Sequence, residues 1–364
     1  MAGEVAAEWA RTRPRGAAPT ADATVLVLGD LSPRLADALE DLGHTVTRWH
    51  RLPSPNQLHT PWPPPGRCGE VWVRMPRSSL EAAMLLHAAA ARVDDGRRTH
   101  LYGANNEGIR SAARHFPDGS DEPRAALIKR RCRVLTAVRS APPPHPDGLD
   151  NWKFSAPVDW GTGERPWTFY PGVFAYGRLD PATALLIEAL PEIPAGSRVL
   201  DFGAGTGPIG AAVLERGGRD TEVHLLEPDA VSLAAAAANV PGATLRAASD
   251  LSDVPGRFDL IVTNPPIHVG SAQSLRTVEA LAQAAPAALA KGGSLLLVAQ
   301  RRLPLARVLG DSFGDVRPLV DKGQFRVWRA TTGRQSTRQP SAEPRRPRGR
   351  AVSARRGQSS RLRR

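Results

Sequence analysis

Residues 259–268 read Asp-Leu-Ile-Val-Thr-Asn-Pro-Pro-Ile-His, an apolar run that ends in a proline turn. The run predicts a buried strand, and the prolines predict its end because proline cannot donate to a strand ladder. Upstream, residues 198–207 read Arg-Val-Leu-Asp-Phe-Gly-Ala-Gly-Thr-Gly, a short apolar run leading into a glycine turn. Ligands of open parallel sheets bind outside the carboxyl ends of the strands. The two turns therefore predict a Rossmann-like sheet with one ligand-binding edge.

Strands and helices alternate through the second half of the chain, residues 151–330, which we interpret as one doubly wound α/β domain. The predicted helices are residues 181–190, 208–216, 230–239 and 277–289. The predicted strands are residues 198–201, 222–227, 244–247, 258–263 and 294–298, with a late edge strand at 326–330.

In the first half, residues 21–140, strands and helices alternate in the same way, so a duplicated architecture is predicted. Its predicted strands are residues 24–30, 44–49, 70–75 and 99–103, and its helices are 35–42 and 79–93. The proline-rich residues 141–150 predict a stiff linker between the two domains.

Both ends of the chain are expected to be disordered, as a leader at residues 1–20 and a basic tail at 331–364. The tail holds eleven Arg and one Glu, so it carries +10 of the net charge of +12. It has too few apolar residues to offset its chain entropy. Such a tail would attract RNA in a salt-dependent way, or it is a solvated extension without a role.

The bulk composition excludes several classes of protein. The 364 residues, 41% of them apolar, are enough for two cores. The only cysteines, Cys68 and Cys132, form no CxxC pair, so we expect neither a disulfide framework nor a metal site. No apolar stretch approaches the ~18 residues of a membrane span. We expect a reduced, cytoplasmic setting and a monomer.

The glycine turn suits a nucleoside ligand, because Gly203 and Gly205 permit tight backbone angles and close approach to the main chain. Asp201 at the start of the turn suits a cationic amino group. Glu227 ends the next strand, where it can accept hydrogen bonds from two ribose hydroxyls. These two acids favour S-adenosylmethionine over the pyrophosphate of a dinucleotide. The expected cofactor-binding residues are Asp201, Gly203, Ala204, Gly205, Gly207, Glu227, Ser249, Asp250 and Asn264.

Ser249 and Asp250 follow the short third strand of the domain. Asp250 could contact the amino group of adenine, or it could cap a helix or form a turn. Both interpretations stay open on the sequence alone.

The Asn-Pro-Pro turn suits an aromatic amino group, whose lone pair is delocalised and therefore poorly nucleophilic. The side-chain oxygen of Asn264 and the carbonyl of Pro265 can fix both amino protons and so orient the lone pair. The prolines stiffen the turn. His268 could touch the base, help a proton leave, or merely be polar lining. The residues expected at the reacting group are Asn264, Pro265, Pro266, Ile267 and His268.

These residues resemble the guanine-N2 methyltransferases of ribosomal RNA, the small-subunit methyltransferase C and large-subunit methyltransferase G group. The matching stretches are residues 171–174, 179–180, 201–207, 249–250, 256–259, 264–270 and 323–330. Looser matches, at residues 102–109 and 131–135, extend the resemblance to the first half.

The resemblance implies that the second half transfers a methyl group from S-adenosylmethionine to guanine N2 in ribosomal RNA, most simply that of the small subunit. It also implies that the first half is a degenerate copy that no longer binds cofactor and that supports folding or holds RNA. Ile267 departs from the family pattern, which usually has a base-stacking aromatic residue there, and Ala175 replaces a typical serine.

Two other functions stay open on the sequence. The same turn suits adenine N6 or the side-chain amide of a protein glutamine as acceptor. A non-catalytic RNA-binding assembly factor would use the basic tail and keep both sheets as scaffold.

Overall fold

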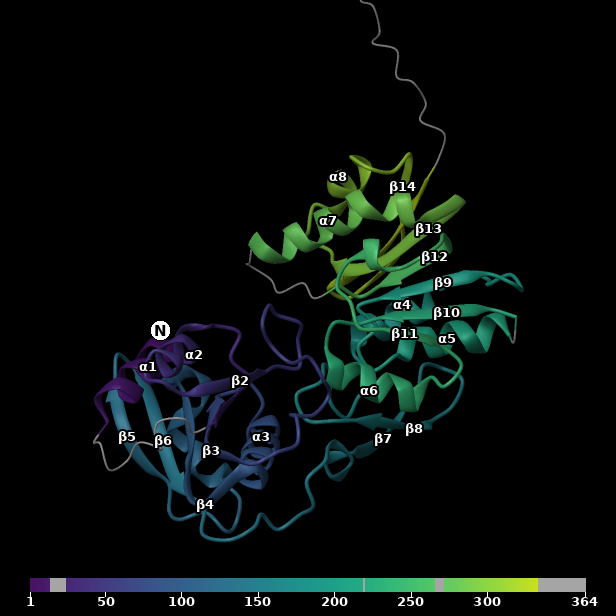
Figure 1. Cartoon of the computed structure of the whole chain (residues 1–364). Helices are drawn as coiled ribbons and strands as arrows, with labels where there is room; N and C mark the ends of the chain where they lie inside the picture. The colour runs from purple at the N-terminus through teal and green to yellow at the C-terminus, as the bar shows by residue number, and fades with distance from the viewer. Residues whose placement is uncertain (14–23, 219, 266–271, 333–364) are drawn as a thin grey trace, which may run out of the picture. The chain divides into compact units, whose positions relative to one another are not determined.

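Two mainly parallel β-sheets, one in each half of the chain, form the framework of the computed structural model (Figure 1). The structure describes residues 1–13, 24–218, 220–265 and 272–332. All of these residues belong to one compact unit. The predicted basic tail lies outside the described residues, apart from its first two positions.

The first sheet has the strand order β2-β1-β3-β4-β6-β5. Strands β1 to β4 are parallel, and β5 and β6 form an antiparallel hairpin at one edge. Its elements are α1 (Ala2–Thr12), β1 (Thr24–Leu28), α2 (Arg34–Glu40), β2 (Thr45–Trp49), β3 (Cys68–Arg74), α3 (Ser79–Arg92), β4 (Val93–Ala104), η2 (Asn105–Glu107), η3 (Ile109–His115), β5 (Arg124–Lys129) and β6 (Cys132–Val138).

The second sheet has the order β11-β10-β9-β12-β13-β15-β14. Strands β9 to β13 are parallel, and β15 runs antiparallel between β13 and β14. Its elements are η4 (Leu149–Trp152), β7 (Phe154–Val158), β8 (Arg165–Phe169), α4 (Pro181–Glu188), β9 (Arg198–Phe202), α5 (Pro208–Gly217), β10 (Glu222–Leu226), α6 (Ala230–Asn239), β11 (Thr244–Arg246), η5 (Leu251–Asp253), β12 (Phe258–Thr263), α7 (Ala272–Ala288), β13 (Leu289–Gln300), α8 (Leu305–Gly310), β14 (Asp315–Lys322) and β15 (Phe325–Thr331).

Helices cover both faces of the second sheet (Figure 1). Alternate residues of each strand point to opposite faces, so Val199 and Val262 pack under α4, α5 and α6, whereas Leu200 and Ile261 pack under α7 and α8. In a strand that is buried on both faces, side chains on either side pack into a core. This explains the unbroken apolar run before Asn264.

The two sheets share one plan, in which the first strand of each lies inside the sheet and an antiparallel hairpin closes one edge. The predicted pair of Rossmann-like sheets is therefore confirmed.

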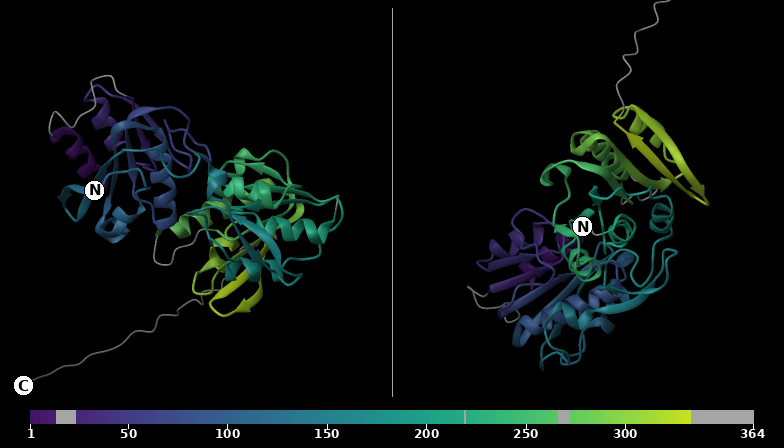
Figure 2. Two further views of the ribbon diagram at one scale, coloured as in Figure 1. Left: turned by 90° about the horizontal axis from the view of Figure 1, so that it is seen from below. Right: turned by 90° about the vertical axis from the view of Figure 1, so that its right-hand side faces the viewer.

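The expectation of a disordered leader is wrong for Ala2–Thr12, which form helix α1. This helix contacts α2 and strands β4, β5 and β6, and it is drawn in purple beside the N label in Figure 2. Val5, Ala6 and Ala10 are fully or almost fully buried by these contacts. Small alanine side chains carry little hydropathy signal, although their helical spacing gives this helix one apolar face.

The late strand predicted at 326–330 is confirmed as β15 (Phe325–Thr331), but it does not form the edge of the sheet. Residues of β15 pair with both β13 and β14, so β14 forms the edge instead. Most residues of β14 are exposed and it contains Pro318, a composition that resembles a loop but that an edge strand tolerates.

In the described residues, no helix combines the length and the apolar character needed to cross a membrane. The same residues contain no group of three or more His, Cys, Asp or Glu side chains arranged to hold a metal ion.

A buried ion pair secures the end of α1. Arg13 forms an ion pair with Glu70 of β3, and His100 of β4 contacts the same carboxylate, with every side chain at most 2% exposed. Burial alone would raise the pKa of Glu70, but His100 and Arg13 hold it at about 2.

We expect Arg13→Ala to lower the free energy of unfolding by about 3–5 kcal/mol, because it leaves a buried carboxylate without its cation. Arg67→Ala is the control, since its ion pairs are 46% exposed on the arginine side and such pairs contribute about 0–1 kcal/mol. Urea unfolding of both variants measures the difference, and equal losses would contradict the importance of burial.

Candidate active site

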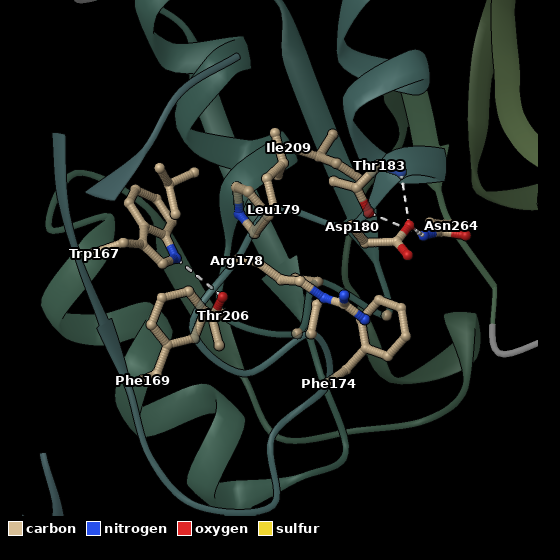
Figure 3. A pocket seen from close by; sticks show the side chains of 16 residues that line it. Trp167, Phe169, Phe174, Arg178, Leu179, Asp180, Thr183, Thr206, Ile209 and Asn264 are labelled. Atoms are coloured by element: carbon tan, nitrogen blue, oxygen red, sulfur yellow. Dashed lines mark hydrogen bonds between the residues drawn. The ribbon is translucent and has the colours of Figure 1, made fainter. Parts of the chain in front are cut away.

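The glycine turn and the Asn-Pro-Pro turn lie on neighbouring strands. β9 and β12 pair in parallel, with Asp201 opposite Val262, so both strands reach the carboxyl edge at the same level. Gly203, Gly205 and Asn264 line one cavity at that edge (Figure 3). The structure thus brings the two predicted turns together around a single space.

This cavity measures only about 40 Å³, whereas pockets for small molecules commonly hold ~300–1,000 Å³. The segment that carries Phe174, Ala175 and Arg178 forms part of its wall. Phe174 is 62% exposed, unlike the buried floor formed by Ala204 and Ile209. The cavity is therefore smaller than a nucleoside-sized ligand.

Three glycines of the loop have left-handed backbone angles, with φ of 71°, 57° and 91° at Gly203, Gly205 and Gly207. An added Cβ at Gly203 or Gly205 would meet no heavy atom within 4 Å, so both present bare backbone to open space. At Gly207 an added Cβ would lie 2.7 Å from Val240. Gly207 therefore allows α5 to pack against the end of α6.

The side chain of Asp201 lies beneath the loop and does not line the cavity. It is fully buried, and its Oδ2 accepts a hydrogen bond from the backbone N–H of Gly210 at 3.0 Å. Its Oδ1 has no hydrogen-bond partner among the described residues. Burial, reinforced by the charge of Glu227, raises the pKa of Asp201 to about 7. The site therefore contains one buried, unpaired carboxyl oxygen.

Glu227 follows β10 and supports the loop from the side. Its two oxygens accept hydrogen bonds from the backbone N–H groups of Gly205 and Asp229, each at 2.8 Å. The residue is 8% exposed, and burial raises its pKa to about 7 although both hydrogen bonds oppose the shift. Each carboxylate oxygen has a further lone pair, so Glu227 can accept additional hydrogen bonds from vicinal hydroxyls.

Ser249 and Asp250 are exposed and do not line the cavity. Asp250 caps η5 by accepting a hydrogen bond from the N–H of Ser252 at 2.9 Å. In this structure Asp250 thus has the capping role that was one of its two predicted roles.

Asn264 is held by two side chains of the α4 region. Its Nδ2 donates to Asp180 Oδ2 at 3.1 Å and to Thr183 Oγ1 at 2.9 Å (Figure 3). An ionised carboxylate accepts but cannot donate, so Asp180 determines which end of the amide faces it. The amide oxygen of Asn264 is consequently turned away from α4 and can accept from another donor.

Asp180 and Thr183 were not predicted as site residues. Asp180 also caps α4, because its Oδ2 accepts from the N–H of Thr183 at 2.9 Å. An Asp before a Pro indicates the start of a helix. That pattern gives no sign of a contact with Asn264, which lies 84 positions away.

The remaining residues of the turn are only partly described. Pro265 is buried, whereas Pro266, Ile267 and His268 lie outside the described residues. The roles expected of those three stay predictions.

An aromatic wall closes the cavity on the side of β8. Trp167, Phe169 and Phe174 line it, and Trp167 Nε1 donates to Thr206 Oγ1 at 3.0 Å. This hydrogen bond ties the β7–β8 hairpin to the glycine loop. The other aromatic residues near the entry to this domain, Phe154, Tyr170 and Tyr176, do not line the cavity.

A buried arginine from the first half joins two parts of the site. Arg51 donates through Nε to Asp229 Oδ1 at 2.7 Å and through Nη1 to the carbonyl of Pro171 at 3.1 Å. The same guanidinium pairs with Glu81 of α3 at 2.9 Å. Asp229 also donates its backbone N–H to Glu227. Arg51 thereby fixes the loop that carries Glu227 to the segment that leads into the outer wall.

Comparison with known proteins matches both halves of the chain to one family. Residues 167–329 match the methyltransferase small domain, and residues 19–154 match the N-terminal part of the same family. Ribosomal RNA small subunit methyltransferase C of Pseudomonas entomophila is 35% identical over 264 residues, which cover 71% of this chain and 78% of the relative. The protein of the same name from Chromohalobacter salexigens is 33% identical over 331 residues, covering 88% and 89%.

A solved structure supports the same relationship. The 16S rRNA N2 G1207 methyltransferase of T. thermophilus, solved in complex with AdoMet and guanosine, is 26% identical with a TM-score of 0.75. The match covers 91% of this chain and 92% of that one. With the glycine loop and the Asn-Pro-Pro turn on neighbouring strands, these matches show that the chain belongs to the ribosomal RNA small subunit methyltransferase C family of S-adenosylmethionine-dependent enzymes.

Proposed function

We propose that this protein transfers a methyl group from S-adenosylmethionine to the exocyclic N2 of a guanine in the RNA of the small ribosomal subunit. The observation that carries the proposal is the amide of Asn264, which Asp180 and Thr183 orient so that its oxygen can accept from an amino group. The names of the relatives, and the solved relative with AdoMet and guanosine, support guanine as the acceptor.

The residues around the glycine loop fit the cofactor. Gly203 and Gly205 leave open space against the backbone, and Glu227 has lone pairs for two ribose hydroxyls. Asp201 supplies a buried carboxyl with an unpaired oxygen beneath the loop, where its negative form favours a cationic ligand. When bound, S-adenosylmethionine supplies an electrophilic methyl group on a sulfonium centre.

The chain's own contribution to the reaction is to hold the acceptor. The Asn264 side-chain oxygen accepts one amino proton of guanine, and the Pro265 carbonyl accepts the other. These two hydrogen bonds orient the nitrogen lone pair and favour the tetrahedral geometry that the nitrogen acquires as it reacts. A strong base is not needed, because the nitrogen becomes acidic as the new bond forms.

We assign catalysis to residues 151–330 and a supporting role to residues 21–140. In the first sheet, the turn after β1 contains Asp30, which accepts a hydrogen bond from the hydroxyl of Tyr102 at 2.5 Å. The acid that follows β1 is thus already hydrogen-bonded to a side chain of the first half. A monomeric, cytoplasmic enzyme is part of the proposal, and the buried free thiols Cys68 and Cys132 agree with a reducing compartment.

If the acceptor were adenine N6 or a protein glutamine, it would make the same hydrogen bonds to Asn264 and Pro265. A non-catalytic assembly factor would make none of these hydrogen bonds. Mapping methylated nucleotides in ribosomal RNA from a strain that lacks the gene separates these functions. A guanine that loses its N2-methyl group there, and regains it when the purified protein is added, is the expected result. An unchanged methylation map would contradict the proposed function.

Asn264→Ala should reduce kcat at least about 100-fold, because it removes an acceptor that acts on the reacting group. The affinity for S-adenosylmethionine should change little, since the glycine loop keeps its contacts. Thr183→Val is the graded companion, because it removes only one of the two partners of the Asn264 amide. Methyl-transfer assays and calorimetry measure both properties, and full activity in Asn264→Ala would remove this residue from the mechanism.

Cofactor affinity should increase between about pH 6 and about pH 8, because the pKa of both Asp201 and Glu227 is raised to about 7. Their ionised forms attract a cation and accept hydrogen bonds. The effect on stability has the opposite sign, since groups with raised pKa stabilise the folded protein at low pH and lose that contribution as pH passes about 7. Calorimetric titration with S-adenosylmethionine tests the first trend. Glu227→Gln should make the increase of cofactor affinity with pH less steep. An equally steep increase in that variant would contradict the role assigned to Glu227.

Arg51→Ala should lower the free energy of unfolding by about 3–5 kcal/mol, because it leaves the carboxylates of Asp229 and Glu81, whose side chains are only 14% and 13% exposed, without a cation. It should also weaken cofactor binding by freeing the loop that carries Glu227. Arg51→Lys keeps the charge but cannot bridge several partners with a planar fork, so it should recover stability more than cofactor affinity. Urea unfolding measures the stability of Arg51→Lys, and calorimetry measures its affinity for S-adenosylmethionine. Equal recovery of stability and affinity would contradict this prediction.

A further inference from the structure

The rim of the first sheet has a hollow that the proposed active site does not use. Its polar lining residues follow the carboxyl end of β4 or belong to the turn of the β5–β6 hairpin at the sheet edge. Its volume is about 470 Å³, and its polar lining is Asn105, Asn106, Arg110, Arg130 and Arg131. The carboxyl edge is where open α/β sheets bind ligands.

The three arginines of the hollow are exposed and form no ion pair or hydrogen bond through their side chains with the described residues. Two acids close to the hollow already have other cationic partners. Glu107 pairs with Arg74 at 2.6 Å, and Glu8 pairs with Lys129. The hollow therefore keeps an excess of positive charge.

The turn that presents two of these arginines is strained. Lys129 pairs with Cys132, so Arg130 and Arg131 form a two-residue hairpin loop. Their φ angles are 49° and 61°, the left-handed values of a type I′ turn, which strongly favours Asn-Gly. Strained residues cluster at binding sites, so two arginines at positions suited to Asn-Gly point to a function for their side chains.

The turn is also held in place. The carbonyl of Arg131 accepts from the N–H of Asn105 at 2.8 Å, and Arg133 Nε donates to the side-chain oxygen of Asn105 at 3.1 Å. These bonds fix the hairpin to the segment that follows β4. The arginines are thus displayed from a rigid base, with amide groups beside them.

We propose that this hollow, the residues Asn105, Asn106, Arg110, Arg130 and Arg131, binds the phosphate backbone of the substrate RNA. Guanidinium groups bind phosphate oxygens through paired N–H donors, and asparagine amides can bind phosphates or 2′-hydroxyls. The identity of the RNA rests on the proposed function. The site is separate from the cofactor cavity and gives the first half a direct role in holding substrate.

The test compares two variants that lose the same charge. The hollow variant carries Arg110→Gln, Arg130→Gln and Arg131→Gln. The control carries Arg97→Gln, Arg307→Gln and Arg317→Gln, which are exposed and have no ion pair among the described residues. Binding of protein-free 16S ribosomal RNA is measured over a range of salt concentrations, and S-adenosylmethionine affinity is measured alongside.

The hollow variant should bind this RNA about tenfold more weakly than the control at low salt, with a salt slope reduced by up to ~2, because each phosphate contact on single-stranded RNA contributes ~0.7. Its cofactor affinity should be unchanged. Equal RNA affinity and slope in the two variants would overturn the proposal. Loss of binding to inorganic phosphate without loss of binding to RNA would also overturn it, by showing a small-anion site.

A second variant separates binding from folding. Arg130→Asn with Arg131→Gly suits the type I′ turn, so it should raise the melting temperature while it weakens RNA binding. Increased stability with unchanged RNA affinity would count against the proposal. If the methylation map of ribosomal RNA is unchanged in a strain that lacks the gene, the proposed function fails instead, whatever the hollow variants show.

Discussion

The register between β9 and β12 determines the geometry of the candidate active-site cavity. Asp201 pairs with Val262, and the glycine loop and Asn264 begin directly after these positions. Side chains alternate between the two faces of a sheet, so a slip of one residue would move Leu200 and Ile261 to the wrong core. The packing of the two helix layers thus holds the loop and the amide opposite each other. The precision of the site comes from the hydrophobic cores on either side of it.

Buried acids show how the two halves differ. Glu70 in the first sheet has its pKa held at about 2 by His100 and Arg13, so it is a paired structural charge. Asp201 and Glu227 in the second sheet form no ion pair with the described residues, and burial raises their pKa values to about 7, although the nearby charge of Arg51 opposes the shift at Glu227. Keeping unpaired acids buried is unfavourable for folding, and such groups are typical of functional sites. In the proposed function, the cationic cofactor supplies the charge that these two acids lack.

The sequence predicted most of the framework, because buried parallel strands and their turns leave strong local patterns. The strand at 258–263 and the helix at 230–239 agree with β12 and α6 residue for residue. The glycine loop and Asn264 were also predicted to face one ligand space, and they line one cavity. Helix α1 and strand β14 escaped detection, since one is rich in small residues and the other is mostly exposed.

Contacts distant in sequence could not be predicted in this way. The partners of Asn264 come from α4, and the partner of Asp229 is Arg51, 178 positions earlier in the chain. The position of Asp201 was predicted correctly, but its burial beneath the loop depends on how α5 packs. The narrow cavity likewise depends on the rim around Phe174, whose position no local pattern specifies.

The duplicated fold resolves an electrostatic conflict that a single sheet edge would face. A cationic cofactor is favoured by negative charge, which in the proposed function comes from Asp201 and Glu227, both buried next to the glycine loop of the second sheet. A polyanionic RNA is favoured by positive charge, and arginines beside the cofactor would weaken both acids' attraction for it. In the proposed arrangement Arg110, Arg130 and Arg131 lie at the rim of the first sheet, within the same compact unit. In this arrangement the first sheet holds RNA phosphates through arginines that lie apart from the cavity of the second sheet, whose wall includes Arg178.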